Sequence, residues 1–272
     1  MKEAGEITML VPLRGSWALI LGVSSGMGRA TARALAAEGV NVLGVYFDRD
    51  EGEKMAEELA GELREQGVEA HFFNRNAASS SAREEVTETA ARLTGPAGLR
   101  ITLHSLAFGT LLPYLGEPGA ETVAPRQMAM TVDVMAHSLV YWTQALHSAR
   151  LLRPGAKIYA LTSSGTSRIM PSYGAVSAAK CALESHVRQL AVELAPAGVA
   201  INALRAGITM TPALELIPGG PALAELARTR NPHRRITVPE DVGEAVLGLS
   251  LSDSSWLTGN VIGVDGGELV SI

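Results

Sequence analysis

Short apolar runs alternate along the chain with longer segments in which apolar residues recur at helical spacing. Runs of the first kind are typical of strands buried on both faces, and segments of the second kind are typical of helices that bury one face. The predicted strands span 17–21, 40–47, 70–73, 101–104, 158–161, 199–204 and 261–264, and the predicted helices span 29–38, 51–66, 81–93, 125–149, 172–194 and 245–251. This alternation predicts an α/β fold of Rossmann type: a doubly wound parallel sheet of about seven strands with helices on both faces.

The helical pattern that begins at Pro171 and Ser172 carries the most concentrated candidate chemistry. Tyr173 and Lys180 are nearly two helical turns apart, so both side chains are expected on one face with about 10 Å between them along the axis. Ser163 stands just upstream, where the preceding strand ends. A tyrosine and a lysine on a helix are more often ordinary surface residues, and only the rest of the chain favours a site. The helix itself is predicted from a single apolar stripe formed by Val176, Leu183, Val187, Leu190 and Leu194.

A glycine-rich turn directly follows the first predicted strand and precedes the first predicted helix. Gly22, Gly26 and Gly28 give it the spacing GxxxGxG. Glycines let the backbone turn tightly and approach a ligand, and the amides at a helix N-terminus favour phosphate. Such a turn can also simply cap a helix, but its place after the first strand favours a nucleotide site.

The tip of the second predicted strand reads Tyr46-Phe-Asp48-Arg49, at the place where the adenosine ribose of a dinucleotide is expected. Tyr46 stands where an acid for the ribose hydroxyls of NAD would be most natural, and Asp48 and Arg49 have opposite charges. The choice between NAD and NADP therefore remains open at this point. Asn76, beyond the third strand, is a candidate for the adenine edge, and a role in the turn backbone is equally compatible with its position.

Composition narrows the classes of protein. The chain has 272 residues, 47% of them hydrophobic and 19% charged, which predicts one globular domain over 1–272. The net charge of −5 argues against nucleic acid as a partner. Acids near the start, and no long apolar run, favour a cytoplasmic protein without a membrane anchor. No metal-ligand spacing is found, and the one cysteine, Cys181, is expected to be a packed side chain.

These motifs together resemble the short-chain dehydrogenase/reductase family over nearly the whole chain. The residues that carry the resemblance are Gly22, Gly26 and Gly28, Ser163 and Ser164, Tyr173 with Lys180, Asn202-Ala203, Thr211 and Val264-Asp-Gly-Gly267. The common family pattern places the tyrosine four residues before the lysine, and here Val176 stands there. The spacing Tyr173-x6-Lys180 instead resembles the enoyl-acyl-carrier-protein reductases. The segments His104–Phe108, Asp133, Pro171–Tyr173 and Arg205–Thr211 agree with that branch.

The resemblance implies roles for particular residues. Ser163 stands where the main branch of these reductases has a second tyrosine, so the serine-bearing branch, typically NADPH-dependent, is the closer likeness. NADP is thus favoured over NAD as the cofactor, with Tyr173, Lys180 and Ser163 as catalytic residues. The resemblance also implies an acyl thioester substrate, which an acyl carrier protein can carry, and a homotetramer. The cofactor-binding residues would be Gly22, Ser24, Ser25, Gly26, Met27, Gly28, Tyr46, Asp48, Arg49, Asn76, Ala77, Ser105, Leu106, Lys180, Gly207, Thr209 and Thr211.

Three functions remain open. In an enoyl thioester the hydride goes to the β carbon while negative charge develops on the thioester oxygen, so a displaced tyrosine fits reduction of the 2,3 double bond. A carbonyl reductase or alcohol dehydrogenase, such as a 3-oxoacyl-acyl-carrier-protein reductase, is the second function, and Val176 counts against it. The third is a catalytically silent nucleotide-binding protein. In addition, the basic run Arg228–Arg235 is a candidate docking surface for an acidic carrier protein, or an ordinary charged surface.

Overall fold

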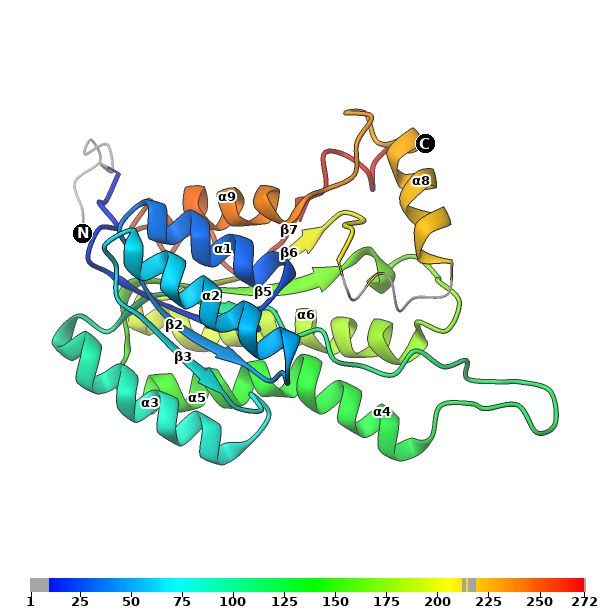
Figure 1. Cartoon of the computed structure of the whole chain (residues 1–272), viewed down its shortest axis with the longest axis horizontal. Coiled ribbons are helices and arrows are strands. Elements are labelled where there is room, and N and C mark those ends of the chain that lie inside the picture. The colour runs from blue at the N-terminus through cyan, green and yellow to red at the C-terminus, as the bar shows by residue number, and fades with distance from the viewer. Residues whose placement is uncertain (1–9, 212–213, 215–218, 272) are drawn as a thin grey trace.

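The computed structural model describes residues 10–211, 214 and 219–271. In this part of the chain one sheet has the strand order β3-β2-β1-β4-β5-β6-β7, and all neighbouring strands are parallel (Figure 1). The predicted fold class is therefore confirmed. The strands are β1 (Trp17–Leu21), β2 (Asn41–Tyr46), β3 (Ala70–Asn74), β4 (Leu99–His104), β5 (Leu152–Ser163), β6 (Ala200–Ala206) and β7 (Val261–Val264).

Helices cover both faces of the sheet (Figure 1). The helices α1 (Gly26–Ala37), α2 (Glu51–Glu65) and α9 (Pro239–Ser250) pack on one face. The helices α3 (Ser80–Thr94), α5 (Ser138–Ser148) and α6 (Gly174–Leu194) pack on the other. The helix α4 (Pro125–Val132) continues into α5 through a π-helical turn at Asp133–His137, and α8 (Gly220–Arg230) lies beside the C-terminal segment.

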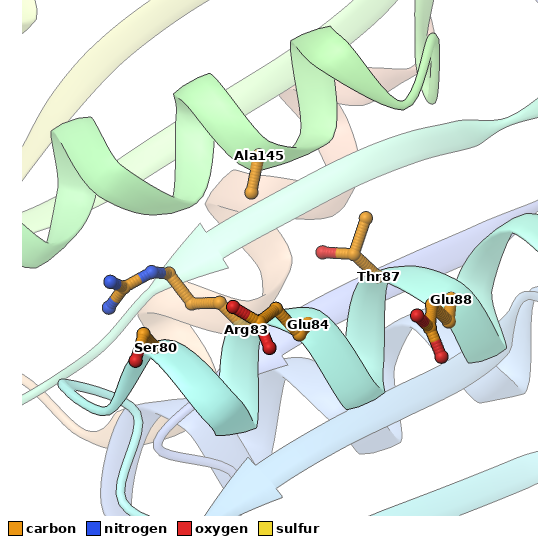
Figure 2. Close-up of a pocket in the computed structure, with 6 residues that line it drawn as sticks. All are labelled: Ser80, Arg83, Glu84, Thr87, Glu88 and Ala145. Carbon is orange, nitrogen blue, oxygen red and sulfur yellow. The ribbon is translucent and has the colours of Figure 1, made fainter.

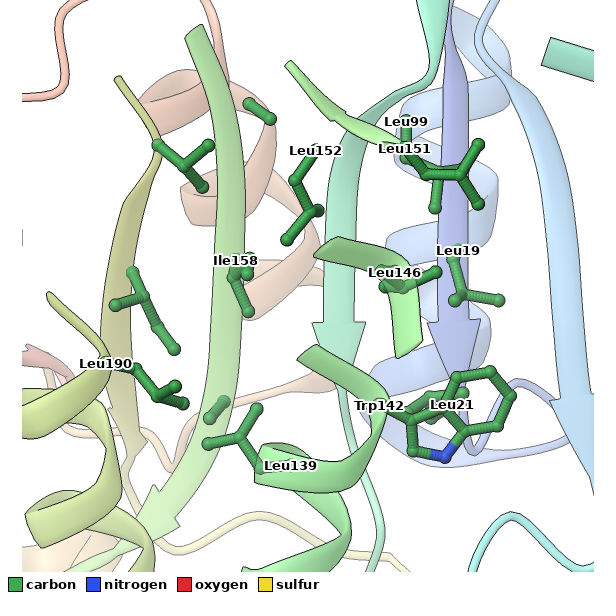
Figure 3. Close-up of a cluster of buried hydrophobic side chains, with 14 of the residues drawn as sticks. Leu19, Leu21, Leu99, Leu139, Trp142, Leu146, Leu151, Leu152, Ile158 and Leu190 are labelled. Atoms are coloured by element: carbon green, nitrogen blue, oxygen red, sulfur yellow. The ribbon is translucent and has the colours of Figure 1, made fainter. Parts of the chain in front are cut away.

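Strand β1 shows how the apolar runs produce these two layers. Its side chains alternate, so that Leu19 and Leu21 join the core under α3, α5 and α6, whereas Ala18 and Ile20 join the core under α1, α2 and α9. Figure 3 shows Leu19 and Leu21 together with Trp142 of α5 and its neighbours. Full burial of one such leucine contributes about 1.5–3 kcal/mol. A strand buried on both faces must be apolar at every position, which is the pattern in the sequence.

The strand order reverses between β1 and β4. The chain runs from β1 outward to β3 and then returns to the other side of β1 with β4. In doubly wound sheets the crevice beyond the carboxyl ends of the strands at this reversal is where ligands bind. Loops that leave β1, β4, β5 and β6 at that edge carry most of the predicted site residues.

All the predicted strands are present, and the differences lie at less regular segments. Strand β5 begins at Leu152, before the predicted start, because the stretch Arg153-Pro-Gly155 breaks the apolar pattern without ending the strand. The helix predicted over 125–149 is interrupted by the π turn, where the Ser138 hydroxyl donates a 2.7 Å bond to the Val134 carbonyl. Helix α8 was not predicted, because alanine provides most of its apolar positions and gives only a weak periodic pattern. Among the described residues, the longest and most apolar helices still fall short of what a membrane crossing requires.

Candidate active site

The glycine-rich turn after β1 is shaped by close backbone contacts. Gly22 has φ +90°, and a Cβ there would lie 2.5 Å from the Ser105 carbonyl oxygen at the end of β4. A Cβ at Gly28 would overlap the Gly22 carbonyl oxygen. Both positions therefore need glycine, and the turn brings the start of α1 against the loop after β4.

This turn fits a dinucleotide pyrophosphate. Helix α1 begins at Gly26, its first turn carries no acidic side chain, and its amides face the crevice edge of the sheet. On the opposite side, a Cβ at Gly26 would lie 3.6 Å from Cγ2 of Thr211, so the loop after β6 closes over the helix start. Residues Ser24, Ser25 and Met27 lie in the same turn and helix start.

The other predicted cofactor residues lie beyond the ends of neighbouring strands. Asp48 and Arg49 follow β2, Ala77 follows β3, and Ser105 and Leu106 follow β4. In the loop after β6, the Thr209 hydroxyl donates a 2.9 Å bond to the Gly207 carbonyl. All these predicted residues therefore share one edge of the sheet.

At the adenosine end the side chains are mainly acidic and amide groups. Burial raises the pKa of Tyr46, and the charges of Glu53, Glu57 and Asp48 raise it further. Asn74, which the sequence analysis did not single out, donates 2.9 Å to the Asp48 carbonyl and 3.1 Å to Glu53. Arg49 is exposed. An asparagine at the last position of a strand was the only available signal for Asn74.

Asn76 acts on its own turn. Its Oδ1 accepts a 2.9 Å bond from the Ala78 amide, and its carbonyl accepts from the Ser79 amide. This is the turn-backbone role that the sequence left as an alternative to the adenine edge.

Lys180 is buried, with 5% of its surface exposed. Its ammonium donates to the Leu161 carbonyl at 2.7 Å and to the Leu106 carbonyl at 3.3 Å, so it joins the ends of β5 and β4. Burial lowers the pKa of Lys180 to about 8, and Glu184 partly opposes this effect. The cation therefore stands at the crevice beside the predicted cofactor loop.

His104, the last residue of β4, is a neutral neighbour of this cation. It is fully buried and shares a 2.8 Å bond with the Ser138 hydroxyl. Because that hydroxyl donates to the Val134 carbonyl, it accepts from Nε2–H of His104. Burial and the charge of Lys180 lower the pKa of His104 to about 3, so the site holds one cation here and not two.

Tyr173 lies one residue before α6 and points at Ser163. Its hydroxyl donates a 3.3 Å bond to Ser163 Oγ, which also accepts the Gly165 amide at 3.1 Å. Burial raises the pKa of Tyr173, and the Ser163 bond lowers it by less. Desolvation therefore dominates the pKa of this phenol.

Val176 fills the position at which the common family pattern has its tyrosine. It is 5% exposed and packs with Met135 and Ala179. A Cβ at Gly109 would lie only 2.8 Å from Val176 Cγ2, so the loop after β4 packs closely against this valine. The tyrosine at the start of α6 is thus Tyr173, three residues before the usual position.

A cavity of about 620 Å³ opens beside Tyr173. Its walls come from the loop after β4, the loop after β5 and the start of α6. Apart from Pro171, Ser172 and Tyr173, the sequence analysis missed the wall residues, because an irregular loop carries no periodic signal. The side chains that define the wall are Leu112, Pro113, Tyr114, Arg168, Ile169 and Met170, and Arg168 is the charged one among the lining residues.

Three further sequence expectations have clear outcomes. Asp133, which the resemblance singled out, is half-buried at the π turn and reaches solvent. Asn202 binds the 257–260 segment, because its side chain bonds the Leu257 carbonyl and the Asn260 amide. The packed position expected for Cys181 is wrong: the residue is exposed, since the buried stripe of α6 passes through its neighbour Lys180.

A second hollow, of about 330 Å³, lies between α3 and α5 (Figure 2). Arg83, Glu84 and Glu88 line it, and none of the predicted site residues does. No group of three or more histidine, cysteine or acidic side chains able to hold a metal occurs among the described residues.

Comparison with known proteins identifies the family. The fold, the glycine-rich turn after β1 and the pair Tyr173 and Lys180 define an NAD(P)-dependent oxidoreductase of the short-chain dehydrogenase/reductase class. Residues 22–268 match the model of the family described as Enoyl-(Acyl carrier protein) reductase, and the chain belongs to that family.

Relatives within this class differ in their named substrates. The enoyl-acyl-carrier-protein reductase (NADH) FabI of Escherichia coli K12 is 28% identical over 257 residues, 94% of each chain. The trihydroxynaphthalene reductase PfmaI of Pestalotiopsis fici is 25% identical over 265 residues, covering 93% of this chain and 89% of its own. A short chain dehydrogenase from Burkholderia cenocepacia J2315 in complex with NADP superposes with a TM-score of 0.80 at 25% identity, covering 95% and 99% of the two chains.

Proposed function

We propose that the chain, acting as one catalytic domain, uses NAD(P)H to reduce the 2,3 double bond of trans-2-enoyl thioesters. The observation that carries the proposal is the position of Tyr173 together with the packing of Val176. The phenol lies before α6, beside Ser163, while the position usual for carbonyl reduction is filled by a packed valine. A donor displaced in this way matches a reaction in which charge appears away from the carbon that accepts hydride.

The residues have distinct roles in this proposal. Bound NAD(P)H supplies the hydride. Tyr173 and Ser163 together stabilise the enolate oxygen, and Lys180 holds the nicotinamide ribose. Gly22, Gly26 and Gly28 let the backbone approach the pyrophosphate, and Thr209 and Thr211 bind the carboxamide and pyrophosphate from the loop after β6.

The cavity beside Tyr173 would receive the acyl part of the substrate. Its volume of about 620 Å³ lies within the usual range for small-ligand sites. Several large apolar side chains are exposed in the loops that leave β4, β5 and β6, and an acyl chain would cover them. They are Phe108, Tyr114, Leu115, Ile169 and Met210.

Carbonyl reduction, for example of 3-oxoacyl thioesters, is the second candidate. The observation that favours it is the direct hydrogen bond between the Tyr173 and Ser163 hydroxyls, since such a pair can also act on a ketone oxygen. The similarity to a trihydroxynaphthalene reductase is compatible with this second candidate.

The choice of cofactor and the assembly are part of this proposal. NADPH is preferred over NADH, because Tyr46 offers no carboxylate and the exposed Arg49 can pair with a 2′-phosphate. The chain forms a homotetramer, and its substrate is carried by an acidic carrier protein that docks on the 228–235 run.

One assay separates the two reactions. Cofactor oxidation is followed with a trans-2-enoyl thioester and with a 3-oxoacyl thioester of the same chain length, for the wild type and for Tyr173→Phe. The proposal expects enoyl reduction, lost on removal of the phenol hydroxyl. A wild-type protein that reduces the ketone and ignores the enoyl substrate would overturn the enoyl assignment.

A further inference from the structure

A buried carboxylate outside the predicted catalytic set lies where three segments meet. Glu268 follows β7 and is 4% exposed. Its Oε2 accepts a 2.9 Å bond from the Ile208 amide, in the loop after β6. A Cβ at the preceding residue, Gly207, would lie 2.8 Å from the same oxygen, so the fit allows only glycine there.

The other carboxylate oxygen faces the loop after β5. Nη1 of Arg168 lies 3.9 Å from Glu268 Oε1. The same guanidinium donates through Nη2 to the carbonyls of Glu268 and Leu269, at 3.3 Å and 3.2 Å. Arg168 also lines the cavity beside Tyr173. One side chain of the C-terminal segment thus contacts both the loop with Gly207–Thr211 and the loop with the cavity wall.

We propose that Glu268 is a positioning residue that fixes the loop after β6 against the loop after β5, and so sets the spacing between the cofactor side and the substrate side of the site. The statement about the substrate side rests on the proposed function. The statement that Glu268 fixes the two loops depends only on the contacts above. Glu268 is not among the residues that line the cavity, so it acts through Ile208 and Arg168 and is not a catalytic residue.

Charged and polar groups from several segments surround Glu268. Arg168 is the facing cation, and Asp265 is a facing anion on the same segment, itself 3.9 Å from Arg205 of β6. On the segment between α8 and α9, His233 lies beside Gly266, and the Thr237 hydroxyl lies beside Gly207. Burial raises the pKa of Glu268, an effect opposed by the Ile208 bond and by Arg168 and reinforced by Asp265.

The raised pKa of Glu268 gives a way to distinguish a residue that positions the two loops from one that only stabilises the fold. A carboxyl whose pKa is higher in the folded than in the unfolded state favours folding below its unfolded pKa, and that contribution is lost as pH rises through the folded pKa. Above its folded pKa the ionised Glu268 therefore costs stability, and Glu268→Gln should not lower Tm there. The same substitution keeps one acceptor for Ile208 but loses the attraction to Arg168, so the two loops should loosen.

The test compares wild type, Glu268→Gln and the matched control Glu225→Gln, an exposed glutamate on α8 paired with Arg228. Hydrogen exchange is measured for residues 164–171 and 205–211, and NADPH and NADH affinities are measured by fluorescence titration without substrate. We expect faster exchange in both loops, an unchanged or higher Tm at pH 7–8, and cofactor affinity weakened at least about fivefold. The control should match the wild type.

Arg168→Lys tests the other end. It keeps the charge but loses the fork that reaches two carbonyls, and it should loosen residues 164–171 and raise the substrate KM with a smaller effect on cofactor affinity. A lower Tm for Glu268→Gln with unchanged exchange in either loop would overturn the inference. Because exchange and cofactor titration use no thioester, a chain that reduces ketones instead would refute the proposed function and leave this inference standing.

The pH profile gives an independent readout. If the ionised form of Glu268 positions the loops, wild-type kcat/KM should fall as pH falls through its raised pKa, and the fall should be absent or displaced in Glu268→Gln. Identical acid limbs in the two proteins would contradict the inference.

Discussion

The Tyr173 hydroxyl donates a 3.3 Å hydrogen bond to Ser163 Oγ, and the Gly165 amide donates to the same oxygen at 3.1 Å. Because Ser163 Oγ accepts both bonds, its own hydrogen is left to donate to a ligand. In the proposed reaction, Tyr173 stabilises the developing charge through Ser163 or donates to the substrate directly. We therefore expect the two hydroxyls to act as one unit.

Replacement of either hydroxyl should have a similar effect on rate. Tyr173→Phe keeps the buried ring and loses the donor, and loss of one such donor typically costs about 10²- to 10³-fold in kcat. Ser163→Ala should cost about as much, and the double variant should be little worse than either single one, because the two act as a unit. The measurement is kcat with an enoyl thioester.

Tyr141→Phe is the matched control, because Tyr141 lies on α5, away from the site. The guanidinium carbon of Arg83 lies 5.2 Å from the centroid of the Tyr141 ring. Its kcat should equal that of the wild type. Fully additive losses for Tyr173→Phe and Ser163→Ala would show that the hydroxyls act separately.

Lys180 should make cofactor binding depend on pH. Its pKa of about 8 means that the ammonium loses its proton as pH rises through 8, where an ordinary lysine remains charged. If the cation binds the nicotinamide ribose, NAD(P)H affinity should fall across pH 7–9. The sign for stability is opposite: between about 8 and 10.5 the unfolded chain binds more protons at this residue, so this group favours folding as pH rises.

Lys157 provides a control within the same fold. It lies in β5, bonds the Ser254 carbonyl, and burial lowers its pKa to about 8 as well. Lys180→Met should weaken cofactor binding and remove its pH dependence, whereas Lys157→Met should change stability alone. Equal cofactor affinities for Lys180→Met and the wild type would contradict the assigned role.

Cofactor preference should respond to the two charges beyond β2. Arg49→Ala should reduce kcat/KM for NADPH more than for NADH, because it removes the partner of the 2′-phosphate. Asp48→Asn should do the reverse, since a nearby carboxylate repels that phosphate. A wild-type preference for NADH of at least about tenfold would refute the NADPH assignment.

The regular parts of the fold were predictable from the sequence, whereas irregular segments were not. A strand such as β1 must be apolar on both faces, so its bounds of 17–21 follow from the pattern. The Gly22 turn was predictable because a left-handed φ and a close carbonyl both require glycine. The cavity wall was not predictable, because Tyr114 and Arg168 are positioned by tertiary contacts and have no periodic neighbours. Glu268 was missed because a lone glutamate in the sequence gives no sign that it is buried.

Assembly can be tested at the C-terminal segment. Val270 is 85% exposed in one chain, and Leu269 beside it is half-buried. Ile272, the third large apolar residue of this segment, lies outside the described residues. If the chain forms a homotetramer through this segment, Val270→Asp should shift the mass measured by light scattering to smaller species. A wild-type protein that is monomeric at working concentration would exclude the tetramer.

The proposed carrier docking depends on which arginines of the 228–235 run remain available. Arg228 forms an ion pair with Glu225 at 2.7 Å. Arg235 donates two hydrogen bonds to the Asp241 carboxylate, of 2.6 Å and 2.7 Å. The pair with Asp241 raises the pKa of Arg235 and lowers that of Asp241, so reversing Arg235 would set two carboxylates side by side at the start of α9. Arg230 and Arg234 are exposed, and Arg234 bonds only the Thr229 carbonyl among the described residues.

Arg230→Glu with Arg234→Glu is therefore the informative variant. An acidic carrier should be repelled, so KM should rise about three- to tenfold for the carrier-linked enoyl substrate and stay unchanged for the coenzyme-A-linked one. The increase should shrink at high salt, because exposed charges are screened. Arg188→Glu on the exposed side of α6 changes the charge in the same direction outside the run and should leave both values unchanged. Equal KM increases for the two substrates would assign the 228–235 run to an ordinary charged surface.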